Sequence, residues 1–190
     1  MESRNIMIVG VGGQGTLLAS KLLGRILLEN GYDVKVSEVH GMSQRGGSVV
    51  TYVRYGEKVY SPIIDKGEAD IIISFELLEA ARWVEYLKEG GILLTNTQRI
   101  NPMPVITGAA EYPKSLEQKL ATLPIRLDAM DALGLALQAG SAKAVNLVLL
   151  GRLSKYFHFT DAQWQDAICR SVPVKFLELN RKAFALGAEA

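Results

Sequence analysis

The sequence of 190 residues predicts an α/β fold in which helices cover both faces of a mostly parallel sheet. Short apolar runs typical of buried parallel strands alternate with helical segments over most of the chain. A glycine-rich turn joins the first run to the first helix, and the last third of the chain is helical. Because a strand, a helix and a further parallel strand require a crossover, we expect one Rossmann-like, doubly wound domain over 1–190. It should have an inserted β-ribbon and a helical C-terminal end.

The first strand, helix and second strand follow from the pattern at the N-terminus. Residues 5–10 form an apolar run that ends in glycine, as a buried strand does. Residues 15–30 place apolar side chains at helical spacing, and Gly31 accepts the left-handed backbone that ends a helix. Residues 32–39 alternate between apolar and polar and predict the second strand.

The middle of the chain predicts a ribbon, then a strand, a helix and another strand. Residues 48–62 alternate around Gly56, which is typical of a hairpin or an edge ribbon that turns there. Residues 69–75 form a continuous apolar run and predict a buried strand. We expect a helix over 76–88 and a strand over 92–96 after it.

The C-terminal part is rich in loops at first and then helical. Four prolines between 101 and 124 predict loops, with one short helix at 115–121, and 123–129 resembles a last strand. Thr160 and Gln163 have the spacing of a capping box. The expected helices are 129–139, 142–158, 161–171 and 174–186, the last two separated by Pro173.

Composition limits the classes of partner. Charged residues make up 22% of the chain and the formal net charge is +1, so the overall electrostatics favour neither nucleic acid nor a membrane surface. No apolar run approaches the roughly 18 residues of a membrane-spanning helix. The N-terminus leads directly into a strand, so we expect a cytoplasmic protein.

The chain has one cysteine, Cys169, and two histidines. This set excludes an internal disulfide and a self-contained zinc or iron–sulfur site, so we expect no metal site. Cys169 is expected to be a buried, inert thiol within a helix. Any redox cofactor would therefore belong to another chain.

The glycine-rich turn "GVGGQG" carries the first functional prediction. Gly10, Gly12 and Gly15 have G-x-G-x-x-G spacing after a strand and before a helix. Glycines let a backbone approach its ligand closely, and the N–H groups at a helix N-terminus favour a diphosphate. Gly13 belongs to the same candidate cofactor-binding turn, and the amide of Gln14 is expected to point at a ligand or partner. A turn shaped only by packing is the alternative.

Glu38 supports a different function, that of a stand-alone NAD(P)-binding Rossmann oxidoreductase. It lies 23 residues beyond Gly15, about where an acidic residue binds the ribose hydroxyls of a dinucleotide. The segment after it does not continue into a helix, because the chain enters "HGMSQRGG" and then a strand. That break interrupts the βαβ unit where an adenosine half would bind.

The segment "HGMSQRGGS" is too rich in functional side chains and glycines for a packing loop. Arginine is a planar, permanently charged fork that binds carboxylate or phosphate through two parallel hydrogen bonds. Adjacent glycines let the backbone turn closely beneath a bound group. The candidate ligand-contacting residues here are Ser43, Gln44, Arg45, Gly46 and Gly47, and the candidate catalytic residues are Arg45 and His40, which titrates near neutral pH.

Polar side chains also end two predicted strands. Ser74 lies near the end of one apolar run, and Thr95 and Asn96 end the next. Ligands of open α/β sheets bind outside the carboxyl ends of the strands, so these three residues are candidate cofactor contacts. A helix N-cap is the alternative role for Ser74.

Together, "GVGGQGTLLASKLL" and "SEVHGMSQRGGSV" resemble the gamma-type domain of the 2-oxoacid:ferredoxin oxidoreductases, in the form found in enzymes that act on indolepyruvate. The resemblance covers essentially the whole chain. It implies a larger catalytic subunit that carries thiamine diphosphate and iron–sulfur clusters. The complex would decarboxylate an aryl pyruvate, pass electrons to ferredoxin and transfer the acyl group to coenzyme A. This chain alone would be inactive.

The resemblance also implies a role for each of the two motifs. The diphosphate of coenzyme A would lie against Gly12, Gly13, Gln14 and Gly15, and residues 40–45 would project toward the catalytic subunit. A scaffold subunit without a ligand of its own is an alternative, beside the NAD(P)-dependent enzyme. We also expect that the isolated chain can form a homodimer, because a subunit without its partner exposes an apolar patch.

Overall fold

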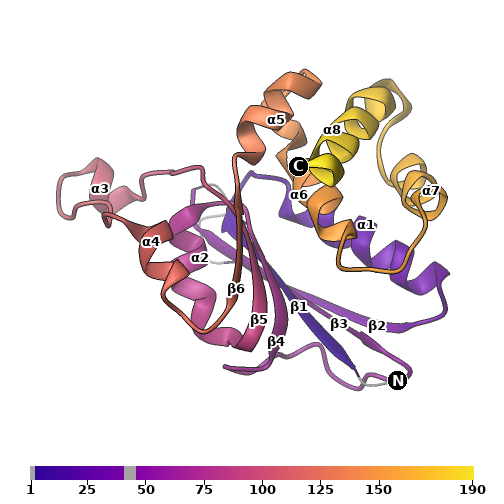
Figure 1. Cartoon of the computed structure of the whole chain (residues 1–190), viewed down its shortest axis with the longest axis horizontal. Coiled ribbons are helices and arrows are strands. Elements are labelled where there is room, and N and C mark those ends of the chain that lie inside the picture. The colour runs from indigo at the N-terminus through magenta and orange to yellow at the C-terminus, as the bar shows by residue number, and fades with distance from the viewer. Residues whose placement is uncertain (1–2, 41–45) are drawn as a thin grey trace.

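A computed structural model describes residues 3–40 and 46–190, and of His40 only the backbone. The described chain forms one six-stranded sheet with the strand order β2-β3-β1-β4-β5-β6, shown in Figure 1. This confirms the predicted α/β fold. The strands are β1 (Arg4–Val11), β2 (Asp33–His40), β3 (Ser48–Gly56), β4 (Ala69–Ser74), β5 (Leu87–Asn96) and β6 (Arg126–Met130).

The sheet is parallel on one side of β1 and antiparallel on the other. β1, β4, β5 and β6 run parallel to one another, whereas β3 pairs antiparallel with both β1 and β2. The inserted ribbon is therefore the β2–β3 pair. The predicted hairpin at Gly56 is wrong, because β3 ends there and residues 57–68 form no strand that could pair with it. Val59 is buried without belonging to a strand, which explains the misleading alternation.

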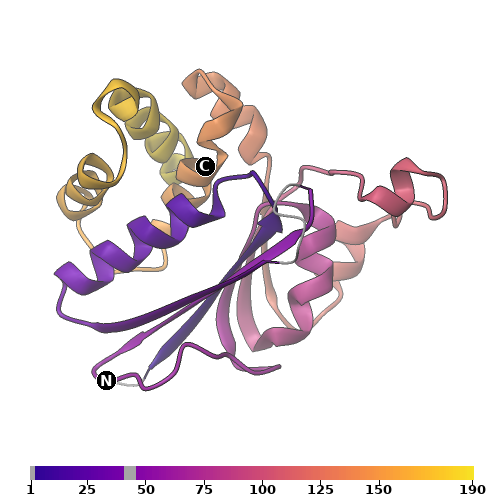
Figure 2. The same ribbon diagram turned by 180° about the vertical axis from the view of Figure 1, so that it is seen from behind.

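Helices cover both faces of the sheet, and each face has its own hydrophobic core. One face is covered by α1 (Thr16–Glu29) and the C-terminal helices, whose core includes Trp164 and Phe184. The other face is covered by α2 (Leu77–Trp83) and α4 (Leu116–Ala121), whose core includes Leu77 and Leu120. Figures 1 and 2 show these two layers from opposite sides. The C-terminal helices are α5 (Ala132–Ala139), α6 (Val145–Ser154), α7 (Asp161–Ser171) and α8 (Leu177–Glu189).

Several element boundaries differ from the predicted ones. α2 ends at Trp83 and a 3₁₀ turn follows at Val84–Tyr86, so the helix expected to reach residue 88 stops one turn early. A short helix, α3 (Met103–Ile106), lies in the segment expected to be loops. Figure 1 shows it at the tip of an excursion that extends away from the sheet. The predicted helix 161–171 coincides with α7, and its capping box is confirmed.

Two glycines let the C-terminal helices approach closely. A Cβ atom on Gly151 of α6 would overlap the carbonyl oxygen of Phe184, and one on Gly187 of α8 would overlap that of Val148. The backbones of α6 and α8 therefore touch at these positions, and α8 is held over the core.

Two further observations bear on expectations from composition. Cys169 is exposed rather than buried, so the expectation of a buried thiol is wrong, because it lies on the outer side of α7. No helix in the described part of the chain is long and apolar enough to cross a membrane.

Candidate functional site

The glycine-rich turn links β1 to α1 at the carboxyl edge of the sheet. Gly13 and Gly15 adopt φ angles of 102° and 89°, a left-handed conformation that favours glycine. Gly10 has a different role, because it is buried within β1 and a Cβ there would lie 2.9 Å from the Cβ of Phe75. Gly10 thus permits close packing between neighbouring strands, whereas Gly12, Gly13 and Gly15 border open space.

The side chain of Gln14 braces the turn from inside, which differs from the expectation that it points at a ligand. Its Oε1 accepts a hydrogen bond from the backbone N–H of Val11 at 2.8 Å. Its Nε2 donates to the carbonyl oxygen of Phe75 at 3.0 Å. Both ends of the amide are therefore used to fix the turn between β1 and the residue after β4.

Ser74, Thr95 and Asn96 are completely buried, so in this structure their side chains do not reach a ligand in solvent. The Ser74 hydroxyl donates to the carbonyl oxygen of Glu76 at 2.7 Å, and that of Thr95 donates to the carbonyl oxygen of Asn96 at 3.1 Å. The Asn96 side chain donates to the Phe75 carbonyl and accepts from the N–H of Ala132 at 3.1 Å. These three residues support the strand ends in this structure, and their contact with a cofactor stays a prediction.

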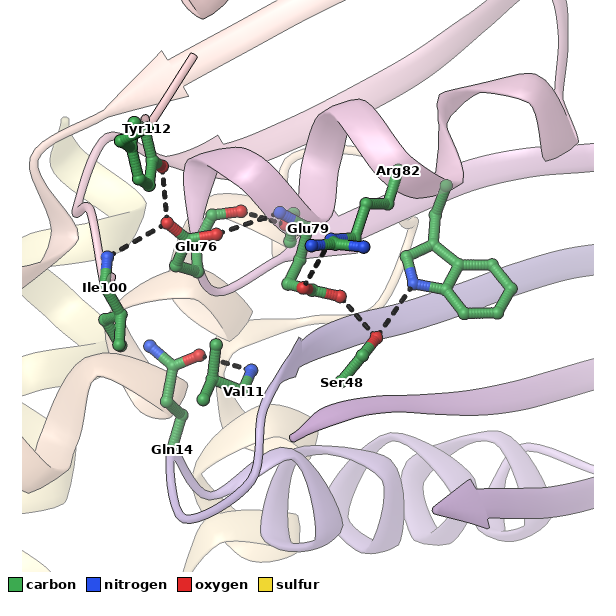
Figure 3. Close-up of polar contacts among 10 residues, drawn as sticks. Val11, Gln14, Ser48, Glu76, Glu79, Arg82, Ile100 and Tyr112 are labelled. Carbon is green, nitrogen blue, oxygen red and sulfur yellow. Dashed lines mark hydrogen bonds and ion pairs between the residues drawn. The ribbon is translucent and has the colours of Figure 1, made fainter. Parts of the chain in front are cut away.

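The carboxylate of Glu76 caps α2 and holds the excursion that carries α3. It is 1% exposed and accepts hydrogen bonds from the N–H groups of Glu79 at 2.9 Å and Ile100 at 3.0 Å. The hydroxyl of Tyr112 donates to it at 2.6 Å, as Figure 3 shows. Burial and this carboxylate raise the pKa of Tyr112. Glu76, not Ser74, is therefore the N-cap of α2.

The stem of the "HGMSQRGGS" loop lies directly beside the glycine turn. The N–H of Gly12 donates to the carbonyl oxygen of Gly47 at 2.8 Å. The N–H of Gly46 donates to the carbonyl oxygen of Gly12 at 3.3 Å. The two sequence motifs thus meet in space. Residues 41–45, which include the predicted contacts Ser43, Gln44 and Arg45, and the side chain of His40 lie outside the described residues.

A polar cluster, of which only Glu79 is buried, joins the loop stem to α2. The hydroxyl of Ser48 donates to the carboxylate of Glu79, and the indole Nε1 of Trp83 donates to the same hydroxyl at 3.3 Å. The Nε of Arg82 lies 3.2 Å from the other carboxylate oxygen of Glu79, as Figure 3 shows. Burial raises the pKa of Glu79, while the bond from Ser48 and the charge of Arg82 act in the opposite direction. Sequence reasoning missed this cluster, since each of these residues alone is typical of a helix or strand surface.

Three clefts adjoin the turn and the loop stem. One of about 510 Å³ is lined by Gly12, Gly13, Gly15 and Glu38 among others. A second, of about 370 Å³, lies on the opposite side of the turn. A third, of about 550 Å³, lies between the stem and the α3 excursion, with Glu79 and Arg82 in its wall.

Lys143 lines the second cleft together with Gly13, Gln14 and Gly15, and sequence reasoning missed it as well. It lies in a 3₁₀ turn just before α6, and Asn146 in the next turn donates to the carbonyl oxygen of Gly15 at 3.4 Å. No sequence signal connects Lys143 to the turn, because their proximity depends on how the C-terminal helices fold back. The structure thus places the positive charge of Lys143 beside the glycine turn.

The residues present fit an anionic ligand better than a metal ion. Within residues 3–40 and 46–190, no group of three or more His, Cys, Asp or Glu side chains could hold a metal. The first turn of α1 itself contains no acidic residue, and its N-terminus opens toward the clefts on both sides of the turn. Backbone N–H groups and a lysine are what a phosphate group requires.

Comparison with known proteins shows the family to which the chain belongs. Residues 5–190 match the family described as pyruvate ferredoxin/flavodoxin oxidoreductase. The chain therefore belongs to that family. Within it, the chain is 46% identical over 195 residues to the indolepyruvate oxidoreductase subunit IorB of Thermococcus kodakarensis, covering 100% of this chain and 96% of the relative. It is 38% identical to the subunit of the same name from Archaeoglobus fulgidus, covering 96% and 92%. The resemblance inferred from the two motifs is thus confirmed.

Solved structures agree on the fold. The gamma subunit of a keto/oxoacid ferredoxin oxidoreductase from Geobacter sulfurreducens has a TM-score of 0.73 at 24% identity, covering 98% of this chain and 96% of that one. The 2-oxoglutarate:ferredoxin oxidoreductase from Magnetococcus marinus, solved with 2-oxoglutarate, coenzyme A and succinyl-CoA bound, has a TM-score of 0.77 at 17% identity. It covers 100% of this chain, which spans 31% of that longer protein.

Proposed function

We propose that this chain is the smaller subunit of a 2-oxoacid:ferredoxin oxidoreductase complex that acts on indolepyruvate or another aryl pyruvate. The observation that carries the proposal is the full-length similarity to IorB subunits, which spans the residues of both motifs that meet at the site. The larger subunit would hold thiamine diphosphate and iron–sulfur clusters. These groups would supply the decarboxylation and the one-electron transfers, with ferredoxin as the acceptor. Aldehyde or oxo-group oxidation would therefore be an activity of the complex and not of this chain alone.

This chain would help to bind coenzyme A and to complete the active site of the larger subunit. The diphosphate would lie against the N–H groups of Gly13 and Gly15, on the side of the turn where Lys143 adds a positive charge. The cleft on the other side of the turn is lined by Glu38. Gln14 would contribute by holding the turn in shape, because its side chain is already bonded to Val11 and Phe75.

The loop after β2 would contact the larger subunit. Its stem, Gly46 and Gly47, is fixed to the glycine turn, so the stem itself lies beside the proposed anion site. From the resemblance, Arg45 would pair with a carboxylate or phosphate, and His40, Ser43 and Gln44 would add polar contacts. Arg45 would suit this role because a guanidinium binds two oxygens at once.

A stand-alone NAD(P)-dependent enzyme is the second candidate, favoured by one observation. Glu38 lines the same cleft as Gly12, Gly13 and Gly15, where an acidic residue could bind ribose hydroxyls. However, β3 lies between β1 and β2, so the strand that carries Glu38 is one position farther from the turn than in a dinucleotide fold. A ligand-free scaffold is the third candidate, and it is favoured by the internal bonds of Gln14.

The deciding experiment is an anaerobic pull-down of the tagged chain from its native extract. The bound material is examined for a large iron–sulfur partner, thiamine diphosphate and reduction of a viologen dye that depends on an aryl pyruvate. We expect all three, with dye reduction weakened by Arg45→Ala and saturable by coenzyme A. A chain that comes down alone and binds NAD(H) tightly, with weaker binding in Glu38→Ala, would establish the second candidate instead. An active complex without any response to coenzyme A would support the scaffold.

A further inference from the structure

Glu79 is a carboxylate buried at the wall of an open cleft, where a helix surface residue would ordinarily be solvated. Its side chain faces the beginning of β3, and the residue is 5% exposed. Burying a carboxylate is costly unless its oxygens are paired with donors. Here one oxygen accepts from the Ser48 hydroxyl and the other pairs with Arg82 at 3.2 Å. A role other than packing would explain why this carboxylate is buried.

The loop stem is held from two sides. On one side, backbone hydrogen bonds join Gly12 to Gly46 and Gly47. On the other side, the side chain of Ser48, the next residue, is held by Glu79 and by the indole N–H of Trp83. The helix that carries Glu79 otherwise packs against β1, β4 and β5. Glu79 therefore ties the stem to the part of the sheet that does not belong to the ribbon.

Among the residues that the structure describes, few charges lie around Glu79. Arg82 is half-exposed and neutralises the carboxylate from the solvent side. Glu76, at the N-cap of the same helix, is a like charge that acts against ionisation. From β3, the facing groups are the Ser48 hydroxyl and the backbone of the stem.

We infer that Glu79 is a positioning residue that holds the stem Gly46–Ser48 against the glycine turn and so sets the affinity of the turn for its anionic ligand. This inference rests on the proposed function, in which that ligand is coenzyme A. Glu79 does not touch the ligand. Glu79 holds the side chain of Ser48, and this fixes the neighbouring residue Gly47. The carbonyl oxygen of Gly47 in turn accepts the hydrogen bond from the N–H of Gly12.

The first test measures the position of the stem without any ligand. Amide hydrogen exchange of Gly12 and Gly46 is followed by NMR in the full chain and in Glu79→Leu, Ser48→Ala and Glu79→Gln. We expect exchange at both glycines to become about tenfold faster in Glu79→Leu and Ser48→Ala, because a charge-assisted bond is lost. The exchange rates of Gly12 and Gly46 in Glu79→Gln should lie between those of these variants and those of the natural chain, because the amide oxygen still accepts from Ser48. The N–H of Phe75, bonded to Val9 at 2.9 Å, is the internal reference and should not change.

The matched control is Glu85→Leu, which removes an exposed carboxylate from the turn after α2 and costs only a surface ion pair with Lys66. It should leave the exchange of both glycines unchanged. Equal exchange in the natural chain, Glu79→Leu and Ser48→Ala would overturn the inference.

The second test uses the assembled complex. Glu79→Leu and Ser48→Ala should raise KM for coenzyme A about tenfold while kcat changes less than twofold, and Glu79→Gln should recover part of the loss. Faster exchange at the glycines with an unchanged KM would refute the effect on ligand affinity. A natural complex that does not respond to coenzyme A at all would instead disprove the proposed function, and the exchange rates would still decide whether Glu79 positions the stem.

Discussion

Gln14 and Asn96 share one hydrogen-bond acceptor, the carbonyl oxygen of Phe75. Gln14 donates to it at 3.0 Å from the turn after β1, and Asn96 donates at 3.2 Å from the end of β5. Because Phe75 follows β4, the ends of three neighbouring parallel strands are joined at one atom. The carboxyl edge of the sheet is thereby fixed before any ligand binds.

Replacing Gln14 with methionine should therefore destabilise the chain. Gln14→Met keeps the length of the side chain but removes the bonds to Val11 and Phe75, which leaves a backbone N–H of the turn without its partner. We expect the free energy of unfolding to fall by about 1–3 kcal/mol in urea titrations. Gln118→Met on the exposed surface of α4 is the control and should change it by less than about 0.5 kcal/mol. Equal stability of the two variants would mean that the amide of Gln14 does not brace the turn.

Adding one methyl group at Gly187 should destabilise the C-terminal helices. A Cβ there would overlap the carbonyl oxygen of Val148, so α6 and α8 must move apart. We expect Gly187→Ala to lower the free energy of unfolding by about 1–3 kcal/mol. Gly24→Ala is the matched control in α1, since its Cβ would meet only Val36 at an ordinary 3.8 Å. It should stabilise the chain by about 0.5–1 kcal/mol, because alanine favours a helix over glycine. Thermal unfolding of the two variants measures the difference in their stability. A loss of stability in both would contradict the claim that Gly187 is needed because α6 and α8 approach closely.

Lys143 should contribute to coenzyme A binding in the complex. Lys143→Ala removes a positive charge from the cleft beside Gly13 and Gly15. We expect the Kd for coenzyme A to rise about tenfold in titration calorimetry, with a smaller effect at high salt. Lys155→Ala, at an exposed position after α6, changes the net charge equally and should have no effect. If the two lysine variants weaken binding to the same small extent, the diphosphate does not lie on this side of the turn.

The stability of the chain should depend on pH through Glu79. Burial raises its pKa above the ordinary value of 4.5, so the folded chain binds a proton more readily than the unfolded chain does. Linkage then makes the contribution of Glu79 to stability fall as the pH rises from 4.5 through the raised pKa. We expect Glu79→Gln to gain stability relative to the natural chain as the pH rises through this range, because glutamine does not titrate. Urea unfolding at several pH values measures the difference, and a relative gain by the natural chain with rising pH would show the opposite sign.

The sequence predicted the parallel part of the fold better than the ribbon. The apolar runs of β1 and β4 are continuous because both faces of these strands are buried, and such runs are recognised without context. The alternation over 48–62 predicts a hairpin or an edge ribbon around Gly56, but burial of Val59 outside a strand gives the same pattern. Only the pairing of β3 with β1 and β2 distinguishes the two cases, and pairing is a long-range property.

The candidate site was predicted in part for a related reason. The two glycine motifs are local signals, and their contact through Gly12 and Gly47 follows from them once the strands are placed. The burial of Ser74, Thr95 and Asn96 was not predictable, because the position at a strand end does not show whether a side chain faces solvent. Lys143 and Glu79 reach the site from elements whose orientation the sequence does not encode locally.

The two hydrogen bonds between the glycine turn and the loop stem have a thermodynamic consequence. In the proposed function, a ligand on the turn and a partner protein on the loop would act on the same short stretch of backbone. If the partner strengthens ligand binding by some factor, the ligand must strengthen partner binding by the same factor, because the cycle of states closes. Assembly of the complex would then depend on the concentration of the ligand.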